Sequence, residues 1–259
     1  MSSRSRALTV CAVLVVALLA VAVFAPLPFS IAAPGETADV LGSKDGKPVI
    51  TVSGATTRPT TGQLRMTTIA ASGPDVAVHL PDVVSGWFDQ KIAVMPHDAV
   101  YPAGDSDQEV NRRNLAQMRQ SQNSATAAAL GYLHRSGDGV KVTLRLAGVG
   151  GPSAGLMFSL GIIDRLAGDG AGHDLTGGRT IAGTGTITDS GKVGPVGGVA
   201  LKTQGAARAG ATVFLVPREE CTDARAHQPK GMRLVPVTSL SGAVDSLRKL
   251  RTGAAVPSC

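Results

Sequence analysis

The feature that most constrains this chain is an uncharged apolar run at residues 7–24, preceded by Arg4 and Arg6. About 20 apolar residues can cross a bilayer as a helix, and the basic flank is expected to stay cytoplasmic. The run is longer than a typical signal-peptide core, which favours a retained single-pass anchor in the cell membrane. Small residues at 30–32 resemble a cleavage site, so removal is the alternative. Both alternatives predict that everything after Pro34 is extracytoplasmic.

Cysteine usage agrees with this compartment. Cys221 and Cys259 both follow the apolar run, and a disulfide between them would persist there; two free thiols are the alternative. The Cys and His residues lack metal-ligand spacing, so neither a metal nor another cofactor is expected. The net charge of +6 is scattered, without runs of basic and aromatic residues, which argues against nucleic acid as a partner.

Local patterns divide the chain into an anchor with its cytoplasmic tip (1–33), a polar linker (34–47), an N-terminal part (48–139) and a core (140–259). The predicted strands are 48–53, 63–71, 140–146, 180–188, 193–196, 212–216 and 232–237. The predicted helices are 106–133, 154–166, 199–209 and 239–250. Residues 76–104 give no firm element, and 168–178 are expected to form a flexible loop. The alternation of strands and helices predicts a layered α/β (α+β) domain.

Ser153 follows Gly-Gly-Pro and begins an apolar helical run. A hydroxyl at a helix start lies beside free backbone N–H groups and the positive end of the helix dipole. Such donors can stabilise the oxyanion of acyl transfer, so Gly151, Pro152 and Ala154 are candidates for the oxyanion site and its turn. The simpler alternative is that Ser153 only caps the helix.

Lys202 shares one helix face with Val199, Ala206 and Ala209, at positions i, i+3, i+7 and i+10. The rest of that face is apolar, which predicts an inward-pointing lysine. A desolvated lysine has a lowered pKa and can accept a proton from a serine near neutral pH. The alternative is a lysine whose stem is buried and whose ammonium reaches solvent.

Two motifs resemble those of the Lon peptidase family. The run Gly151-Pro152-Ser153-Ala154-Gly155 resembles its nucleophile motif, and Val-Gly-Pro-Val-Gly-Gly-Val-Ala-Leu-Lys at 193–202 resembles its lysine motif. In that family the catalytic lysine is the fourth residue after the Gly-Gly pair, which corresponds to Lys202 and excludes Lys192. The resemblance also implies that Thr184 hydrogen-bonds and orients the Ser-Lys dyad.

The chain is similar to the membrane-anchored bacterial branch of that family, which carries an inserted PDZ domain. Three departures bear on substrate selection. There is no room for a PDZ domain between Leu133 and Val140, Thr186 replaces the acidic residue that ATP-dependent Lon has there, and the loop at 168–178 is longer. Relatives often form rings, so the resemblance implies a homo-oligomer.

Other motifs compete for the same residues. Gly151-x-Ser153-x-Gly155 satisfies the nucleophile-elbow pattern of α/β-hydrolase esterases, which would need partners such as Asp189 and His227. The segment 185–192 imitates a phosphate loop, but five residues separate Gly185 from Gly191 and Val193 stands where Ser or Thr should bind magnesium. No nucleotide is therefore expected as a partner.

These observations predict an ATP-independent serine endopeptidase in which Ser153 attacks and Lys202 is the base. Its expected partners are unfolded or extended extracytoplasmic polypeptides and the membrane that holds the N-terminal helix. The rival prediction is a tethered scaffold or substrate-binding module that keeps the fold without turnover.

Overall fold

The computed structural model describes residues 3–89, 91–101, 106–146 and 149–259. They fall into two compact units, the first formed by Met1–Ala33 and Ala71–Gln108 and the second by Pro34–Ala70 and Glu109–Cys259. The expected boundary between 139 and 140 differs from this division. The reason is that β5 (Gln63–Ala71) pairs with β8 (Thr180–Gly183), which joins early and late segments in one sheet.

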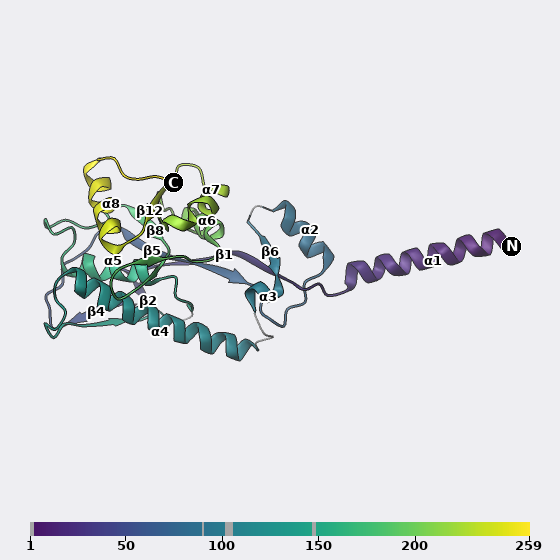
Figure 1. Cartoon of the computed structure of the whole chain (residues 1–259), viewed down its shortest axis with the longest axis horizontal. Helices are drawn as coiled ribbons and strands as arrows, with labels where there is room; N and C mark the ends of the chain where they lie inside the picture. The colour runs from purple at the N-terminus through teal and green to yellow at the C-terminus, as the bar shows by residue number, and fades with distance from the viewer. Residues whose placement is uncertain (1–2, 90, 102–105, 147–148) are drawn as a thin grey trace. The chain divides into compact units, whose positions relative to one another are not determined.

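The first unit contains α1 (Ser3–Phe24), a helix with no buried residue (Figure 1). Of the described helices, it alone is long and apolar enough to cross a membrane, a test that a signal sequence also meets. The helix ends earlier than the predicted anchor. Residues 29–33 instead begin β1 (Phe29–Asp39), which pairs antiparallel with β6 (Ala93–Pro96).

Two helices complete this unit, α2 (Leu80–Phe88) and α3 (His97–Val100). The stretch 76–104 gave no firm prediction because its elements are short and depend on contacts distant in sequence. Leu27 N–H, for instance, donates to the Val78 carbonyl at 2.8 Å, and the Tyr101 hydroxyl donates to the Ser72 carbonyl at 2.6 Å. Residues 90 and 102–104 of that stretch lie outside the described part.

The second unit is built on a sheet in the order β12-β11-β8-β5-β1. Strand β11 (Val213–Pro217) pairs parallel with β12 (Arg233–Val237) and with β8, and β8 pairs parallel with β5. Alternate residues of β11 enter different cores: Val213 and Leu215 pack in one, Phe214 and Val216 in the other. Strands buried on both faces are typical of a parallel sheet covered by helices. The α/β prediction is confirmed.

Helices cover the two faces of this sheet. The first core includes residues of α4 (Asp107–Tyr132), α5 (Gly155–Leu166) and α8 (Leu240–Thr252). The second includes residues of α6 (Val199–Arg208) and α7 (Cys221–Ala226). The 3₁₀ turn Arg218–Glu220 leads directly into α7.

Three strand pairs lie outside the main sheet. They are β2 (Ser43–Lys44) with β3 (Lys47–Pro48), β4 (Ile50–Ser53) with β7 (Lys141–Leu144), and β9 (Thr186–Ile187) with β10 (Val193–Gly194). All three pairs are antiparallel. The short pair β9–β10 connects the sheet to α6 and so helps to set where α6 begins.

The linker predicted at 34–47 is wrong as a structural element. Residues 34–39 are the second half of β1, and Val40 and Leu41 are buried. Their polar neighbours are bonded inside the fold, because the Asp39 carboxylate accepts from the Leu41 and Leu64 N–H groups. The polar residues of this segment form hydrogen bonds within the fold, so its polar composition did not indicate a solvated linker.

The loop at 168–178 is also held more firmly than predicted. The Asp169 carboxylate accepts from the Ala171 and His173 N–H groups and pairs with Arg251 at 2.9 Å. Leu175 and Thr176 are buried. The segment is a loop, as predicted, without helix or strand, and these contacts attach it to the rest of the fold.

Candidate active site

Ser153 lies in the turn that leads into α5, with a half-buried side chain. The turn depends on Gly151, whose φ of +84° is in the left-handed region that favours glycine. Helix α4 holds the turn at two points: Gly151 N–H donates to the Asn114 carbonyl at 3.0 Å, and the Ser121 hydroxyl donates to the Pro152 carbonyl at 3.0 Å. Contacts to a long helix thus fix the backbone directly before the serine.

The end of β8 holds the same turn from another direction. The Ser153 carbonyl accepts from the Gly185 N–H at 2.9 Å and from the Thr184 hydroxyl at 3.3 Å. Leu156 N–H donates back to the Gly185 carbonyl at 3.1 Å. Thr184 is itself fixed, since its N–H donates to the Leu215 carbonyl of β11 at 3.1 Å. These bonds tie the backbone of Ser153 to the centre of the sheet.

Lys202 projects from α6 and is only 4% exposed. Its Nζ donates to Oγ1 of Thr184 at 3.2 Å. Burial lowers its pKa from 10.5 to about 8, although the charge of Glu220 opposes that change. A lysine with this pKa is partly neutral just above neutral pH and can then accept a proton. The prediction that Lys202 points inward is confirmed.

Thr184 is the residue that links the other two. It accepts from the Lys202 ammonium and donates to the Ser153 carbonyl. Among the hydrogen bonds of the described residues, none joins the Ser153 hydroxyl to Nζ of Lys202. In free enzymes such a hydrogen bond is often long and tightens only when the substrate binds, so this geometry is compatible with a nucleophile–base pair.

The backbone N–H groups beside Ser153 differ in whether they already donate a hydrogen bond. Gly151 N–H is already bonded to Asn114, and proline has no N–H, so Gly151 and Pro152 shape the turn. The Ser153 and Ala154 N–H groups have no acceptor within the described part of the chain. They stand at the start of α5, where the dipole favours a negative charge. An oxyanion would find its donors there.

Comparison with known proteins agrees with this geometry. Residues 147–246 match the model of the Lon protease (S16) C-terminal proteolytic domain. The chain carries a Lon-type proteolytic domain. A Lon protease of Chloroflexus aggregans (strain MD-66 / DSM 9485) is 37% identical over 92 residues, which is 34% of this chain and 10% of that protein. The chain therefore matches about a tenth of that relative's length. The model that residues 147–246 match describes a proteolytic domain.

The α/β-hydrolase alternative does not fit the Lon-type domain as it is folded. A nucleophile elbow needs its serine between a strand of the central sheet and a helix. Here the strand before Ser153, β7, pairs antiparallel with β4 outside that sheet. The described residues include no hydrogen bond that joins Asp189, His227 and Ser153.

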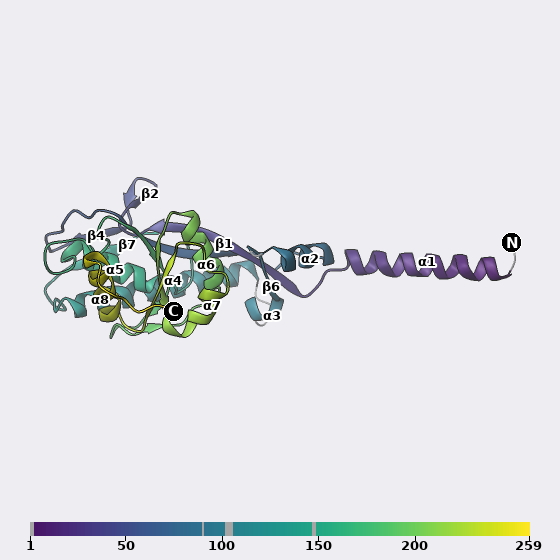
Figure 2. The same ribbon diagram turned by 90° about the horizontal axis from the view of Figure 1, so that it is seen from above.

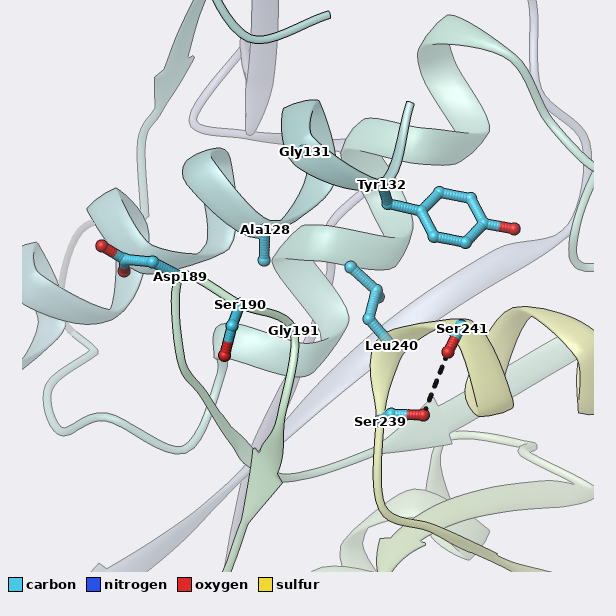
Figure 3. A pocket seen from close by; sticks show the side chains of 9 residues that line it. All are labelled: Ala128, Gly131, Tyr132, Asp189, Ser190, Gly191, Ser239, Leu240 and Ser241. Atoms are coloured by element: carbon cyan, nitrogen blue, oxygen red, sulfur yellow. Dashed lines mark hydrogen bonds between the residues drawn. The ribbon is translucent and has the colours of Figure 1, made fainter. Parts of the chain in front are cut away.

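Asp189 lies in the turn between β9 and β10 and lines a pocket of about 270 Å³ with residues of α4 and the start of α8 (Figure 3). Ser153 is not among the residues that line this pocket. His227 follows the last residue of α7. Within the described residues, neither proposed triad partner shares a hydrogen bond or this pocket with Ser153.

Cys221 and Cys259 form the disulfide that was one of the two alternatives left open by the sequence, with Cα atoms 5.3 Å apart. Glu220, which acts on Lys202, directly precedes Cys221. Asn114, Ser121 and Glu220 carry no motif, and only their positions in the folded chain reveal their roles. Within the described residues, no cluster of three His, Cys, Asp or Glu side chains could hold a metal ion.

Proposed function

We propose that this protein is a membrane-anchored serine endopeptidase that uses Ser153 as nucleophile and Lys202 as general base. The observation that carries the proposal is the path from Lys202 through Thr184 to Ser153, with bonds of 3.2 and 3.3 Å. A buried amine with a pKa of about 8 beside a serine at a helix start suits acyl transfer. A scaffold without turnover would gain nothing from a desolvated lysine, which is unfavourable for folding.

The reaction follows from these positions. Ser153 Oγ attacks the scissile carbonyl carbon, and its proton passes to the neutral Nζ of Lys202. The carbonyl oxygen becomes negative and is stabilised by the N–H groups of Ser153 and Ala154. The Lys202 ammonium then protonates the leaving amine, and the acyl-enzyme forms. Lys202 next takes a proton from water, which attacks the ester carbonyl. As the new carboxyl end leaves, the Lys202 ammonium returns that proton to Ser153 Oγ.

Thr184 would position the lysine during this cycle. As an acceptor for Nζ it orients the base, and as a donor to the Ser153 carbonyl it keeps the nucleophile turn in place. It does not need to exchange a proton with the substrate. Its role is therefore that of a positioning residue.

The proposal extends to location and energy use. Arg4 and Arg6 in the first turns of α1 favour a cytoplasmic N-terminus, and the disulfide between Cys221 and Cys259 suits an extracytoplasmic domain. Substrates would be extended segments of proteins in that compartment. We propose turnover without ATP, since the segment 185–192 departs from the phosphate-loop pattern. Assembly into a homo-oligomeric ring belongs to the proposal through family resemblance.

The test is cleavage of an unfolded protein and a mixed peptide pool by the full chain in detergent, with and without ATP. New termini are identified by mass spectrometry for wild type, Ser153→Ala and Lys202→Met. We expect cleavage without ATP, and a loss of about 10²- to 10⁴-fold in kcat/KM for Lys202→Met. Ser190→Ala and Lys192→Met are the matched controls, because both residues are exposed and lie on the neighbouring turn.

The outcomes separate the proposals. Cleavage that survives in Ser153→Ala would overturn the nucleophile assignment, and full activity of Lys202→Met would overturn the base. Correctly folded wild type that cleaves nothing, with or without ATP, would support the scaffold.

A further inference from the structure

Helix α2 presents an apolar face that the rest of its unit leaves uncovered. Leu80, Val84, Trp87 and Phe88 recur at i, i+4, i+7 and i+8, which places them on one side of the helix. Val84 is 40% exposed, Trp87 70% and Phe88 87%. Such a cluster of large exposed apolar side chains marks a surface that meets another apolar phase.

The orientation of α2 is fixed by its other side. Val83 and Gly86 are buried, and a Cβ at Gly86 would lie 2.5 Å from Cγ2 of Val94 in β6. The helix therefore packs closely on β6 and cannot roll to hide Trp87. Its polar residues Asp82 and Ser85 point elsewhere, since they follow a third arc of the helix. The aromatic face is thus exposed because of the packing.

The end of α1 and the start of α2 are joined by a short link. Leu27, three residues after Phe24, hydrogen-bonds to Val78, which directly precedes the N-cap His79 of α2. Three residues reach at most about 10 Å. The two helices are in contact, and both views place α2 beside the C-terminal end of α1 (Figures 1 and 2). If α1 crosses a bilayer, α2 lies where the chain leaves it.

We propose that α2 lies in the interface of the membrane that α1 crosses, with Trp87 and Phe88 inserted at the headgroup boundary. This inference rests on the membrane-span part of the proposed function and is independent of the peptidase chemistry. Trp and other aromatic rings favour that depth, because one part of the ring is apolar and another tolerates water. An amphipathic helix of this kind lies in the plane of the interface.

The charges of α2 predict how its membrane contact responds to lipid charge and salt. Residues 79–89 include two carboxylates, Asp82 and Asp89, and neither Lys nor Arg. The helix would therefore bind through its apolar face and gain nothing from anionic lipid headgroups. Its membrane contact should be the same on zwitterionic and anionic bilayers, and insensitive to salt. This property distinguishes it from a polybasic membrane anchor.

The experiment uses the full chain reconstituted in vesicles, since Trp87 is its only tryptophan and its fluorescence reports α2 alone. Vesicles contain lipids brominated at shallow or deep acyl positions, in zwitterionic or partly anionic mixtures. We expect Trp87 emission at shorter wavelength than in the denatured chain, strong quenching by shallow bromines and weaker quenching by deep ones. Quenching should be equal in both lipid mixtures.

Two variants keep Trp87 and test the face. Phe88→Asp adds a charge to the apolar side and should abolish bromine quenching. Ser85→Asp adds the same charge to the polar side of the same helix and should preserve it. Flotation with the vesicles is measured for each sample, so that insertion of α1 is followed separately from the position of α2.

Each outcome bears on the inference. Wild type that floats with vesicles but shows no bromine quenching would overturn it. Shortened emission that depends on protein concentration and not on brominated lipid would instead indicate contact between copies, and would also overturn it. Wild type that does not float would remove the membrane span and the inference together. Peptidase activity, assayed in the same samples, reports the catalytic proposal independently of these readouts.

Discussion

Nζ of Lys202 donates a 3.2 Å hydrogen bond to Oγ1 of Thr184, and the same Thr184 hydroxyl donates a 3.3 Å hydrogen bond to the Ser153 carbonyl. One hydroxyl thus fixes a base on α6 and a nucleophile turn before α5. Lys202 and Ser153 lie in other elements of the fold than Thr184. The site therefore depends on how the end of β8 is held between two helices.

Replacing Thr184 by valine keeps the shape of the side chain and removes the hydroxyl. The buried lysine then lacks its acceptor, which should lower the free energy of unfolding by about 1–3 kcal/mol. We expect kcat/KM to fall about tenfold or more, because such energies correspond to factors of that size. Peptide cleavage and urea unfolding measure the two effects. Thr184→Ser keeps the hydroxyl and should restore both; failure to do so would contradict the positioning role.

The pH dependence of activity should follow Lys202. Its pKa is lowered to about 8 by burial, and only the neutral amine can accept a proton, so cleavage should increase as pH rises through about 8. Glu220 raises this pKa, so Glu220→Gln should shift the profile to lower pH. Glu219→Gln changes the same charge at the preceding position and should leave the profile in place. An unchanged profile for Glu220→Gln would refute the electrostatic link.

Gly155 tests how closely the nucleophile turn is packed. A Cβ there would lie 2.7 Å from Cγ2 of Ile187 and 3.0 Å from Oγ of Ser121. Gly155→Ala should therefore destabilise the fold by about 1–3 kcal/mol and reduce cleavage, because the helix start must move. Gly197→Ala is the matched control, since a Cβ there meets nothing within 4 Å. Thermal unfolding of both variants measures the destabilisation. Equal unfolding temperatures for Gly155→Ala and Gly197→Ala would mean that the packing at Gly155 is loose.

The sequence predicted those elements whose pattern is local. Strand β5 was expected at 63–71 and is found at Gln63–Ala71, and the apolar stripe of α6 identified Lys202 as buried. The Gly-Pro-Ser turn before α5 was also visible, because glycine and proline punctuate helix starts. Motif and periodicity were enough for these parts.

The missed parts depend on tertiary partners. Thr37 in β1 looked like linker because it is polar, yet it accepts a hydrogen bond from Nε of Arg65, 28 residues later, at 2.8 Å. Asn114 holds the turn of Ser153 through its backbone carbonyl, which carries no sequence signal. Helix α2 is too short for its period to be recognised without β6 beneath it. Such contacts become visible only in the fold.

The disulfide gives a prediction about stability. Cys221 and Cys259 are 38 residues apart in sequence, and closing a loop of that size restricts the unfolded chain. The double variant with serine at both positions should lose about 3–4 kcal/mol of unfolding free energy. Urea unfolding measures this loss, and a reducing agent should reproduce it in the wild type. Cys11→Ser, which removes the free cysteine, should be neutral.

Asp164 gives a pH-dependent prediction away from the dyad. This carboxyl on α5 is fully buried, and its Oδ1 accepts from the Leu175 N–H at 2.8 Å and lies 3.5 Å from Nη1 of Arg58. Oδ2 has no hydrogen-bond partner among the described residues. Burial raises its pKa from 3.8 to about 6, with Asp174 acting in the same direction and Arg58 against it.

The sign of the effect follows from linkage. Because the folded pKa lies above the unfolded one, the folded state binds the proton more tightly, and Asp164 contributes most to stability below about pH 4. That contribution is lost as pH rises through about 6. Asp164→Asn cannot titrate, so the unfolding free energy of wild type minus variant should fall by about 2 kcal/mol between pH 4 and pH 7. Urea unfolding at both pH values measures it, and a constant difference would mean that Asp164 stays ionised throughout.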